Sequence, residues 1–304
     1  MTHTEKKTLT FIDTIQLRLL LAVCRLLRCA GFKGIYRLGG ILGRLTWRLA
    51  ASRRRYAVSA VQRHLNTGPD EARRIAKASF EHSFRSFLEA VLVKDFPLNE
   101  HNRRLAPLPQ GFLKLLEEQG PLVLVTAHLG GWELLSSVLG QIRPERRRIV
   151  IVREQRNRAA NALIQHLRSR SGVEVVGHRN SAATVLRALR ENGTTAFLVD
   201  HNTRRADAVF LPFLGETAAV NLGPAMLALR AKATLYAMCL QRKPDASYEI
   251  HVAGSLDTRD LEGNVTEKCR RIAEFYTRAM EGFILRFPEQ WFWMHHRWKT
   301  KVEE

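Results

Sequence analysis

Apolar and polar residues alternate along this chain with two different rhythms. Towards both ends of the chain, apolar positions recur at helical spacing, which predicts long helices from Pro69 to about Val93 and from Val265 to Phe287. Between them, short apolar runs typical of buried strands alternate with helical segments. The expected strands are 121–126, 148–152, 173–176, 194–199, 233–240 and 248–252, and the expected accompanying helices are 112–118, 132–139, 159–169, 182–191 and 222–231.

This alternation predicts an α/β fold, in which a central, mostly parallel sheet is flanked by helices. In such a sheet, reactive residues gather at the carboxyl ends of the strands. We divide the chain into residues 1–66, expected to form membrane-associated amphipathic helices, and residues 67–304, expected to form the α/β domain.

Two amphipathic helices are expected within the first fifty residues. Each one carries a stripe of mainly basic residues beside a broad apolar face, and three consecutive arginines, Arg53 to Arg55, follow them. Such helices either pack on a protein core with solvated arginines or lie in a bilayer interface, and the tandem arrangement favours membrane contact. A spanning helix is not expected, because no run of about 18 uncharged apolar residues occurs. The polar stripes consist of Thr14, Arg18, Arg25 and Arg28 in the first helix and of Lys33, Arg37, Arg44 and Arg48 in the second.

The composition adds information about partners. Lys and Arg number 48 and Asp and Glu number 29, so the 304 residues carry a net charge of +19. This excess indicates an anionic partner: nucleic acid, an acidic membrane surface, an acidic carrier protein or a phosphorylated substrate. Four cysteines without a CxxC pair argue against a disulfide scaffold and a cysteine zinc site, and they favour a reducing cytoplasm.

The candidate chemistry lies where the strand 121–126 ends. His128 follows this strand, Gly130 and Gly131 allow a tight turn, and Glu133 falls in the first turn of the next expected helix. We expect the turn to fold Glu133 back beside the imidazole, so that His128 acts as a general base and the carboxylate orients it. A lone histidine at a strand end is more often structural, but the strand, the glycine turn and the helix around it strengthen the prediction.

The nucleophile is expected to belong to the substrate, because no serine or cysteine lies in the turn with His128. A base that deprotonates a substrate hydroxyl for attack on an acyl carbonyl needs no nucleophile from the enzyme, but the developing oxyanion needs a hydrogen-bond donor. A metal is not expected, because no third ligand joins His128 and Glu133 at a familiar spacing.

The segment His128–Glu133, HLGGWE, resembles the HX4D/E motif of the glycerolipid acyltransferase superfamily. Further segments narrow the resemblance to the lipid A biosynthesis (lauroyl or myristoyl) acyltransferases, over about residues 70 to 300. The ending PEQWFWMHHRWK, residues 288–299, is the most specific of these segments. The other matching positions are Arg153, Asn157, Arg168, LVDH at 198–201, VFLPFLG at 209–215 and NLGPA at 221–225.

This resemblance implies that a fatty acyl chain moves from acyl carrier protein, or from acyl-CoA, to a hydroxyl of a lipid A precursor at the cytoplasmic face of the bacterial inner membrane. It implies an acyl thioester as co-substrate and no other cofactor. His128 would be the base and Glu133 its relay partner, while Arg168 would stabilise the thioester oxyanion or bind the donor phosphate. The remaining candidate substrate-binding residues are Arg153, Asn157, Asp200 and Arg204.

The positive charge fits these partners independently. An acidic carrier protein, a phosphorylated glycolipid acceptor and the anionic lipid of the inner membrane are all attracted to a basic protein. Several of the arginines lie on or between the elements that bear the expected site, and planar guanidinium groups suit phosphate geometry.

Two alternatives stay open at this point. In the first, the chain is an acyltransferase whose acceptor is another glycolipid or a lysophospholipid. In the second, the chain is a basic nucleic-acid-binding protein without catalytic activity. Arginines scattered over the whole chain, without a zinc finger, basic zipper or RNP-type motif, argue against nucleic acid as a partner. The C-terminal tryptophans also allow two interpretations, because Trp291 and Trp293 either anchor at a membrane interface or bury into the core as a strap.

Overall fold

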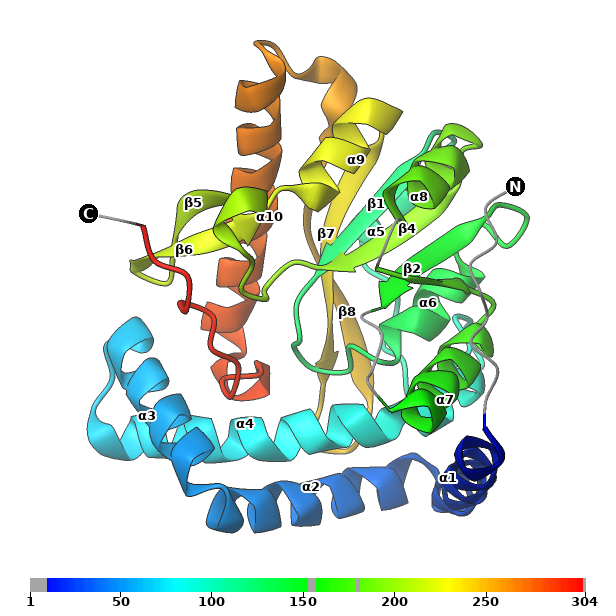
Figure 1. Cartoon of the computed structure of the whole chain (residues 1–304), viewed down its shortest axis with the longest axis vertical. Helices are drawn as coiled ribbons and strands as arrows, with labels where there is room; N and C mark the ends of the chain where they lie inside the picture. The colour runs from blue at the N-terminus through cyan, green and yellow to red at the C-terminus, as the bar shows by residue number, and fades with distance from the viewer. Residues whose placement is uncertain (1–9, 153–156, 179–180, 303–304) are drawn as a thin grey trace.

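The computed structural model describes residues 10–152, 157–178 and 181–302, and shows a six-stranded sheet flanked by helices (Figure 1). The strand order is β3-β2-β4-β1-β7-β8; β8 runs antiparallel to β7, and the other neighbours are parallel. The predicted α/β fold with a mostly parallel sheet is confirmed. The strands are β1 (Leu122–Thr126), β2 (Arg148–Val152), β3 (Glu174–Gly177), β4 (Thr194–Leu198), β7 (Thr234–Arg242) and β8 (Tyr248–Asp257).

Helices cover both faces of the sheet, and successive residues of β1 point into two different cores. Val123 and Val125 belong to one hydrophobic core, and Leu122 and Leu124 belong to the other. All five residues of β1 are buried, as the continuous apolar run predicts for a central parallel strand. The first core takes side chains from α8 (Ser181–Arg190), α9 (Gly223–Ala231) and α10 (Val265–Arg286), and the second takes them from α5 (Gln110–Glu117) and α6 (Leu135–Gln141).

Four N-terminal helices form the lower part of the molecule in Figure 1. α2 and α3 both pack against α4, which passes beneath the sheet, and α1 packs against α7. Gly39 and Gly43 allow α2 to approach α4 closely, because a Cβ at either position would lie 2.5–2.6 Å from the Cα of Glu81 or Arg85. The four helices are α1 (Phe11–Cys29), α2 (Gly31–Leu49), α3 (Ala51–Leu65) and α4 (Pro69–Glu89), and α7 spans Arg158–Ser169.

The first helices share a core with the sheet. Trp47 and Val61 belong to the same hydrophobic core as Val123 of β1. The division of the chain at residue 66 therefore stays a prediction, and it does not coincide with a gap between two cores. Across the described residues, no helix is both long enough and apolar enough to cross a bilayer.

Three elements differ from the expectation. α3 follows the second amphipathic helix directly. Its sequence is rich in arginine and only Ala57, Ala60 and Val61 are buried, so it lacks a clear apolar pattern. The hairpin of β5 (Ala208–Phe213) and β6 (Glu216–Asn221) was not expected, because its proline and glycine resemble loop residues. The helix expected from residue 132 begins three residues later, at Leu135. Short 3-10 segments, η1 (Ala90–Asp95), η2 (Arg205–Asp207), η3 (Thr258–Asp260) and η4 (Pro288–Gln290), complete the fold.

Candidate active site

The turn that carries His128 is held from two sides by backbone hydrogen bonds. The Gly131 N–H donates to the carbonyl of Leu240 at 2.8 Å, and the Gly130 N–H donates to the carbonyl of Gln290 at 3.1 Å. Gly130 has a φ of +63°, which glycine adopts without strain, and a Cβ there would clash with the Leu240 carbonyl. The two-glycine turn therefore fixes His128 at the carboxyl end of β1.

Asp200 orients the imidazole of His128. β4 is a parallel neighbour of β1, with Thr126 opposite Leu198, so Asp200 emerges beside His128 at the same edge of the sheet. Asp200 Oδ1 lies 2.9 Å from His128 Nδ1, and Oδ2 accepts the His128 backbone N–H at 2.9 Å. The indole N–H of Trp291 also donates to Oδ2, at 2.8 Å. The Asp200 carboxylate is thus held by three groups: the His128 ring nitrogen Nδ1, the His128 backbone N–H and the Trp291 indole N–H.

This geometry sets the tautomer of the neutral ring. A carboxylate only accepts hydrogen bonds, so the proton of neutral His128 lies on Nδ1 and Nε2 is left with a free lone pair. The His128 side chain is 29% exposed, whereas that of Asp200 is 3% exposed. The site therefore presents a base whose orienting acid is covered by protein, as in histidine–carboxylate catalytic pairs.

The charges around the ring raise the pKa of His128. Burial disfavours the charged imidazole and is the largest single influence, but attraction and hydrogen bonding to Asp200, together with attraction to Glu133, outweigh burial and the repulsion by Arg168. Burial also acts to raise the pKa of Asp200, yet the charge and hydrogen bonds of His128, with the Trp291 bond, hold that pKa well below its usual range. Asp200 is therefore ionised at neutral pH and stabilises a protonated His128.

Glu133 contacts a different partner from the one expected. Its Oε1 accepts from Arg168 Nη2 at 2.8 Å and its Oε2 accepts from Arg168 Nε at 3.2 Å. Residues 131–134 form turns before α6 begins, which leaves the Glu133 carboxylate facing Arg168 on α7. The orienting contact that the sequence analysis expected from Glu133 therefore comes from Asp200. Attraction to Glu133 raises the pKa of Arg168, although burial opposes this, and keeps its guanidinium charged.

The other predicted substrate-binding residues take separate positions. Asn157 caps α7, where its side chain accepts the Ala160 N–H at 2.8 Å. Arg204 is largely exposed and pairs with Asp207 at 3.1 Å. Arg153 lies outside the described residues. The described structure therefore brings His128, Asp200, Glu133 and Arg168 together, and it shows other partners for Asn157 and Arg204.

Two further histidines lie near Asp200, and the sequence analysis did not include them among the candidate site residues. His201 donates from Nδ1 to the Leu198 carbonyl at 2.9 Å, and His295 accepts the Asn202 N–H at Nε2, also at 2.9 Å. Burial lowers the pKa of His201 and brings that of His295 to about 4. Both rings are therefore neutral at pH 7, and among these three histidines the pKa is raised only at His128.

Aromatic side chains lie close to the His128 ring. The His128 ring lies 5.6 Å from Trp132, in an edge contact, and 6.2 Å from Phe292. Phe87 of α4 contacts both Trp132 and Phe292. Trp291 and Trp293 are buried, which agrees with the interpretation of the C-terminal segment as a strap that buries into the core. An apolar surround suits a hydrocarbon chain and excludes water from a reacting carbonyl.

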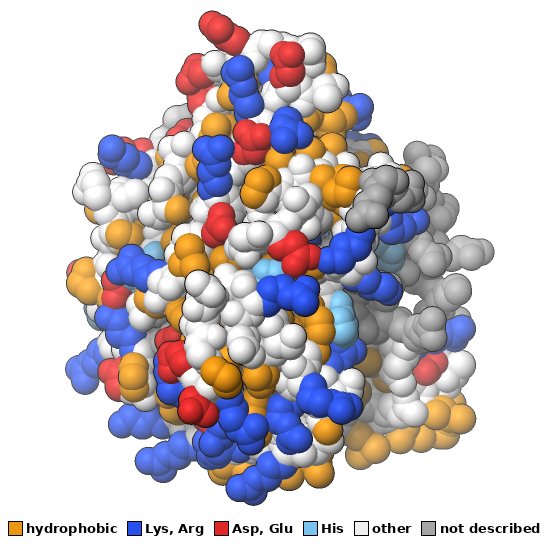
Figure 2. Space-filling model, turned by 90° about the vertical axis from the view of Figure 1, so that its left-hand side faces the viewer, with side chains coloured by type: hydrophobic (Ala, Val, Ile, Leu, Met, Phe, Trp, Pro, Cys, Tyr) orange, Lys and Arg blue, Asp and Glu red, His pale blue; other side chains and the backbone are white. Residues whose placement is uncertain are grey.

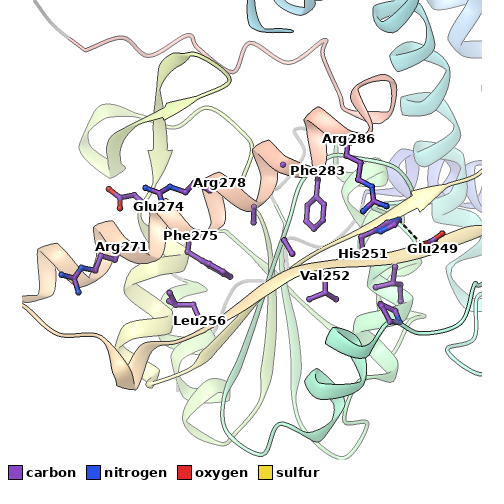
Figure 3. A pocket seen from close by; sticks show the side chains of 15 residues that line it. Glu249, His251, Val252, Leu256, Arg271, Glu274, Phe275, Arg278, Phe283 and Arg286 are labelled. Atoms are coloured by element: carbon purple, nitrogen blue, oxygen red, sulfur yellow. Dashed lines mark ion pairs between the residues drawn. The ribbon is translucent and has the colours of Figure 1, made fainter.

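A cavity of about 840 Å³ lies elsewhere, between β8 and α10 (Figure 3). Val252, Phe275 and Phe283 give it an apolar floor, and Arg278 and Arg286 lie at its rim. Neither His128 nor Asp200 lines this cavity. The position of this cavity therefore does not mark the candidate site, and the His128–Asp200 pair is the candidate on the grounds of hydrogen bonding and charge.

Comparison with known proteins shows the family of the chain. The chain matches the family described as bacterial lipid A biosynthesis acyltransferase over residues 2–300. It is 27% identical over 281 residues to the lipid A biosynthesis lauroyltransferase of Escherichia coli K12, covering 88% of this chain and 86% of that protein. It is 27% identical over 188 residues to the palmitoleoyltransferase of lipid A biosynthesis from the same organism, covering 61% of this chain. That alignment spans 58% of the palmitoleoyltransferase, less than two thirds of its length.

Proposed function

Because the chain belongs to the bacterial lipid A biosynthesis acyltransferase family, we propose that it transfers a fatty acyl chain from acyl carrier protein, or from acyl-CoA, to a hydroxyl of a lipid A precursor. The observation that carries the chemistry is the 2.9 Å contact between His128 Nδ1 and Asp200 Oδ1. It leaves Nε2 as an unprotonated base at the carboxyl end of β1, next to an apolar surround.

The transfer proceeds in one displacement. His128 Nε2 takes the proton of the acceptor hydroxyl while the hydroxyl oxygen attacks the thioester carbonyl. As the carbonyl re-forms, the carbon–sulfur bond breaks, and His128 returns its proton to the departing thiolate. The products are an ester and a free thiol, and no acyl-enzyme forms. Asp200 stabilises the imidazolium while it exists, and the acyl thioester is the only co-substrate that these steps require.

Arg168 and Glu133 support this reaction as a charged pair. Arg168 is protonated and three-quarters buried, so its charge acts in a region of low dielectric constant, where it stabilises a developing oxyanion or a donor phosphate more strongly than in water. Glu133 holds the guanidinium by two parallel hydrogen bonds, which fix its plane. We propose that Glu133 acts as a positioning residue through Arg168 and as a negative charge that favours protonated His128.

The outer faces of α1 and α2 support attachment at the cytoplasmic surface of the inner membrane. α1 and α2 lie at the bottom of the molecule in Figure 1, and Figure 2 shows hydrophobic side chains at the lower right edge, with lysines and arginines along the rest of the lower edge. An apolar surface rimmed by cations matches an anionic bilayer interface. Arg28 is not part of this rim, because it forms an ion pair with Asp95 at the end of η1. The large exposed apolar residues of α1 and α2 are Phe11, Ile12, Ile15, Leu19, Val23, Leu26, Ile41, Leu45 and Leu49.

The test is acyl transfer by the purified protein in detergent micelles. A lipid A precursor is offered with acyl carrier protein or CoA thioesters of several chain lengths, and the products are identified by mass spectrometry. We expect an ester on the glycolipid, formed by the wild type and absent with His128→Ala. Transfer only to a lysophospholipid or another glycolipid would show that the acceptor is that lipid and not a lipid A precursor. An unaffected His128→Ala protein, or a covalent acyl-protein as the transferring species, would exclude the mechanism.

A further inference from the structure

A buried arginine lies directly behind the turn that carries His128. Arg242 ends β7, and its side chain is fully covered by protein. Its guanidinium donates from Nη2 to the carbonyl oxygen of Gly130 at 2.9 Å. The hydroxyl of Ser86 on α4 donates to the same carbonyl oxygen and accepts from Arg242 Nη2 at 2.6 Å. Two donors thus fix the peptide that lies two residues after His128.

The guanidinium is itself held by a completed set of partners. Glu89 of α4 accepts from Nε and from Nη2 at 2.6 Å each, and the Tyr248 hydroxyl donates to Glu89 Oε1, also at 2.6 Å. Nη1 lies 3.0 Å from His82 Nδ1, which accepts because burial and the neighbouring arginines lower the pKa of His82 well below its usual value. Each donor nitrogen of Arg242 therefore has a partner, and the side chain has one available position.

The backbone of Arg242 joins the same turn through a second route. The Gln290 side chain accepts the Arg242 N–H at 3.0 Å and donates to the Arg242 carbonyl at 2.8 Å, while the Gln290 carbonyl accepts the Gly130 N–H. The next residue, Trp291, reaches Asp200. Arg242 is consequently bonded to the segments that place both members of the catalytic pair.

Stability alone is a poor explanation for this ion pair. Removing two charges from water costs several kcal/mol per ion, and apolar residues of similar volume are often equally stable in place of a buried pair. What an apolar pair does not supply is a directed donor to the Gly130 carbonyl. The contact of Arg242 with the turn is the hydrogen bond to the Gly130 carbonyl, so we assign it a geometric role.

We propose that Arg242 is a positioning residue for the reaction. By holding the Gly130 carbonyl, it fixes the position and orientation of the His128 ring relative to the incoming hydroxyl. This proposal rests on the proposed function, because it assumes that His128 is the base. A displacement of about 1 Å at a reacting group lowers a rate by as much as about 100-fold. Loss of the hydrogen bond from Arg242 to the Gly130 carbonyl is therefore expected to lower kcat and leave KM nearly unchanged.

The experiment uses a pair of substitutions that removes both buried charges. Arg242→Met with Glu89→Gln leaves no uncompensated ion, and the glutamine still accepts from Tyr248. The matched control is Arg143→Met at the amino end of the sheet, where Arg143 is also buried and donates to the carbonyls of Glu118 and Gly120 at 3.1 and 2.7 Å. Tm, kcat, KM and the pH profile are measured for each in detergent micelles.

We expect the double variant to lose about 10- to 100-fold in kcat, with KM within about twofold and the acid limb of the pH profile unchanged. Arg143→Met lowers Tm but keeps the kcat of the folded protein. Arg242→Lys, which retains the charge but not the fork of donors, is expected to recover part of kcat; it also serves as the test variant if the double variant does not fold. A folded double variant or lysine variant with wild-type kcat would overturn the proposal. His128→Ala distinguishes a failure of the proposed function from a failure of the Arg242 proposal. If His128→Ala stays active, the proposed function is wrong. If His128→Ala is inactive while the Arg242 variants retain wild-type kcat, only the Arg242 proposal is wrong.

Discussion

The carboxyl end of the sheet and the N-terminal helices depart from the usual distribution of side chains in opposite directions. Around His128, the charged groups Asp200 and Arg242 are buried, whereas along α1 the large apolar residues Phe11 and Leu26 are exposed. Burying a charge and exposing an apolar face are both unfavourable in water. Under the proposed function, this difference has a physical reason: buried charges would prepare a base for a reacting group, and exposed apolar side chains would fit an apolar phase.

The strongest test of the first region is Asp200→Asn. The amide keeps the shape of the carboxylate but removes its charge, so the imidazolium loses its main stabilising partner and the pKa of His128 falls. We expect kcat to drop by about 100- to 1,000-fold, because a placed base contributes effects of this size. The measurement is kcat and kcat/KM against pH.

The sign of the pH effect follows from the state in which His128 works. The base must be unprotonated in the free enzyme, so kcat/KM falls as the pH decreases through the pKa of His128, which Asp200 raises in the wild type against the effect of burial. In Asp200→Asn this acid limb moves to lower pH. The control is Asp260→Asn at an exposed position in η3, which leaves both rate and limb unchanged. An acid limb that does not move in Asp200→Asn would mean that Asp200 does not set the pKa of the catalytic base.

The two carboxylates also show how far the sequence predicts this site. Glu133 is five residues from His128, so a local motif suggests the contact. Asp200 is 72 residues away and reaches the ring because β4, although it follows β2 and β3 along the chain, pairs directly with β1. The alternation of strands and helices predicts a parallel sheet, but several strand orders bury the same apolar residues. The partner of His128 was therefore not decided by spacing; the resemblance indicated only that Asp200 lies near the site.

Local pattern predicts the elements better than their ends or their contacts. The strand at 148–152 and the helices around 159–169 and 265–287 are confirmed within one residue. α3 was missed because its outward arginines dilute the apolar rhythm, and Arg242 was missed because a charged residue at the end of a strand gives no sign of burial. Long-range packing against α4 decides the surroundings of both.

A smaller effect is expected from Glu133→Gln. The glutamine still accepts one hydrogen bond from Arg168 but loses the charge that fixes the guanidinium and favours protonated His128. We expect kcat to fall by about 10- to 100-fold, with little change in Tm. The measurement is a double-mutant cycle with Arg168→Gln.

The cycle distinguishes a role through Arg168 from a direct relay. If Glu133 acts mainly through Arg168, the double variant is little slower than Arg168→Gln alone, because the second change removes nothing further. If the two losses multiply and Glu133→Gln matches Asp200→Asn in size, Glu133 acts on His128 directly and the positioning role is wrong.

The smallest expected effect tests the second region. Leu26 is 73% exposed on α1, and in contact with a bilayer its side chain would leave water for the acyl boundary. Leu26→Glu is therefore expected to weaken binding to vesicles of anionic phospholipid by about fivefold to tenfold, which corresponds to about 1 kcal/mol of lost apolar burial. Leu285→Glu on α10, 57% exposed, is the matched control, and kcat in micelles stays at the wild-type value for both. Equal loss of vesicle binding in the two variants would mean that added negative charge, and not the apolar face of α1, determines attachment, and the contrast between the two regions would then no longer hold.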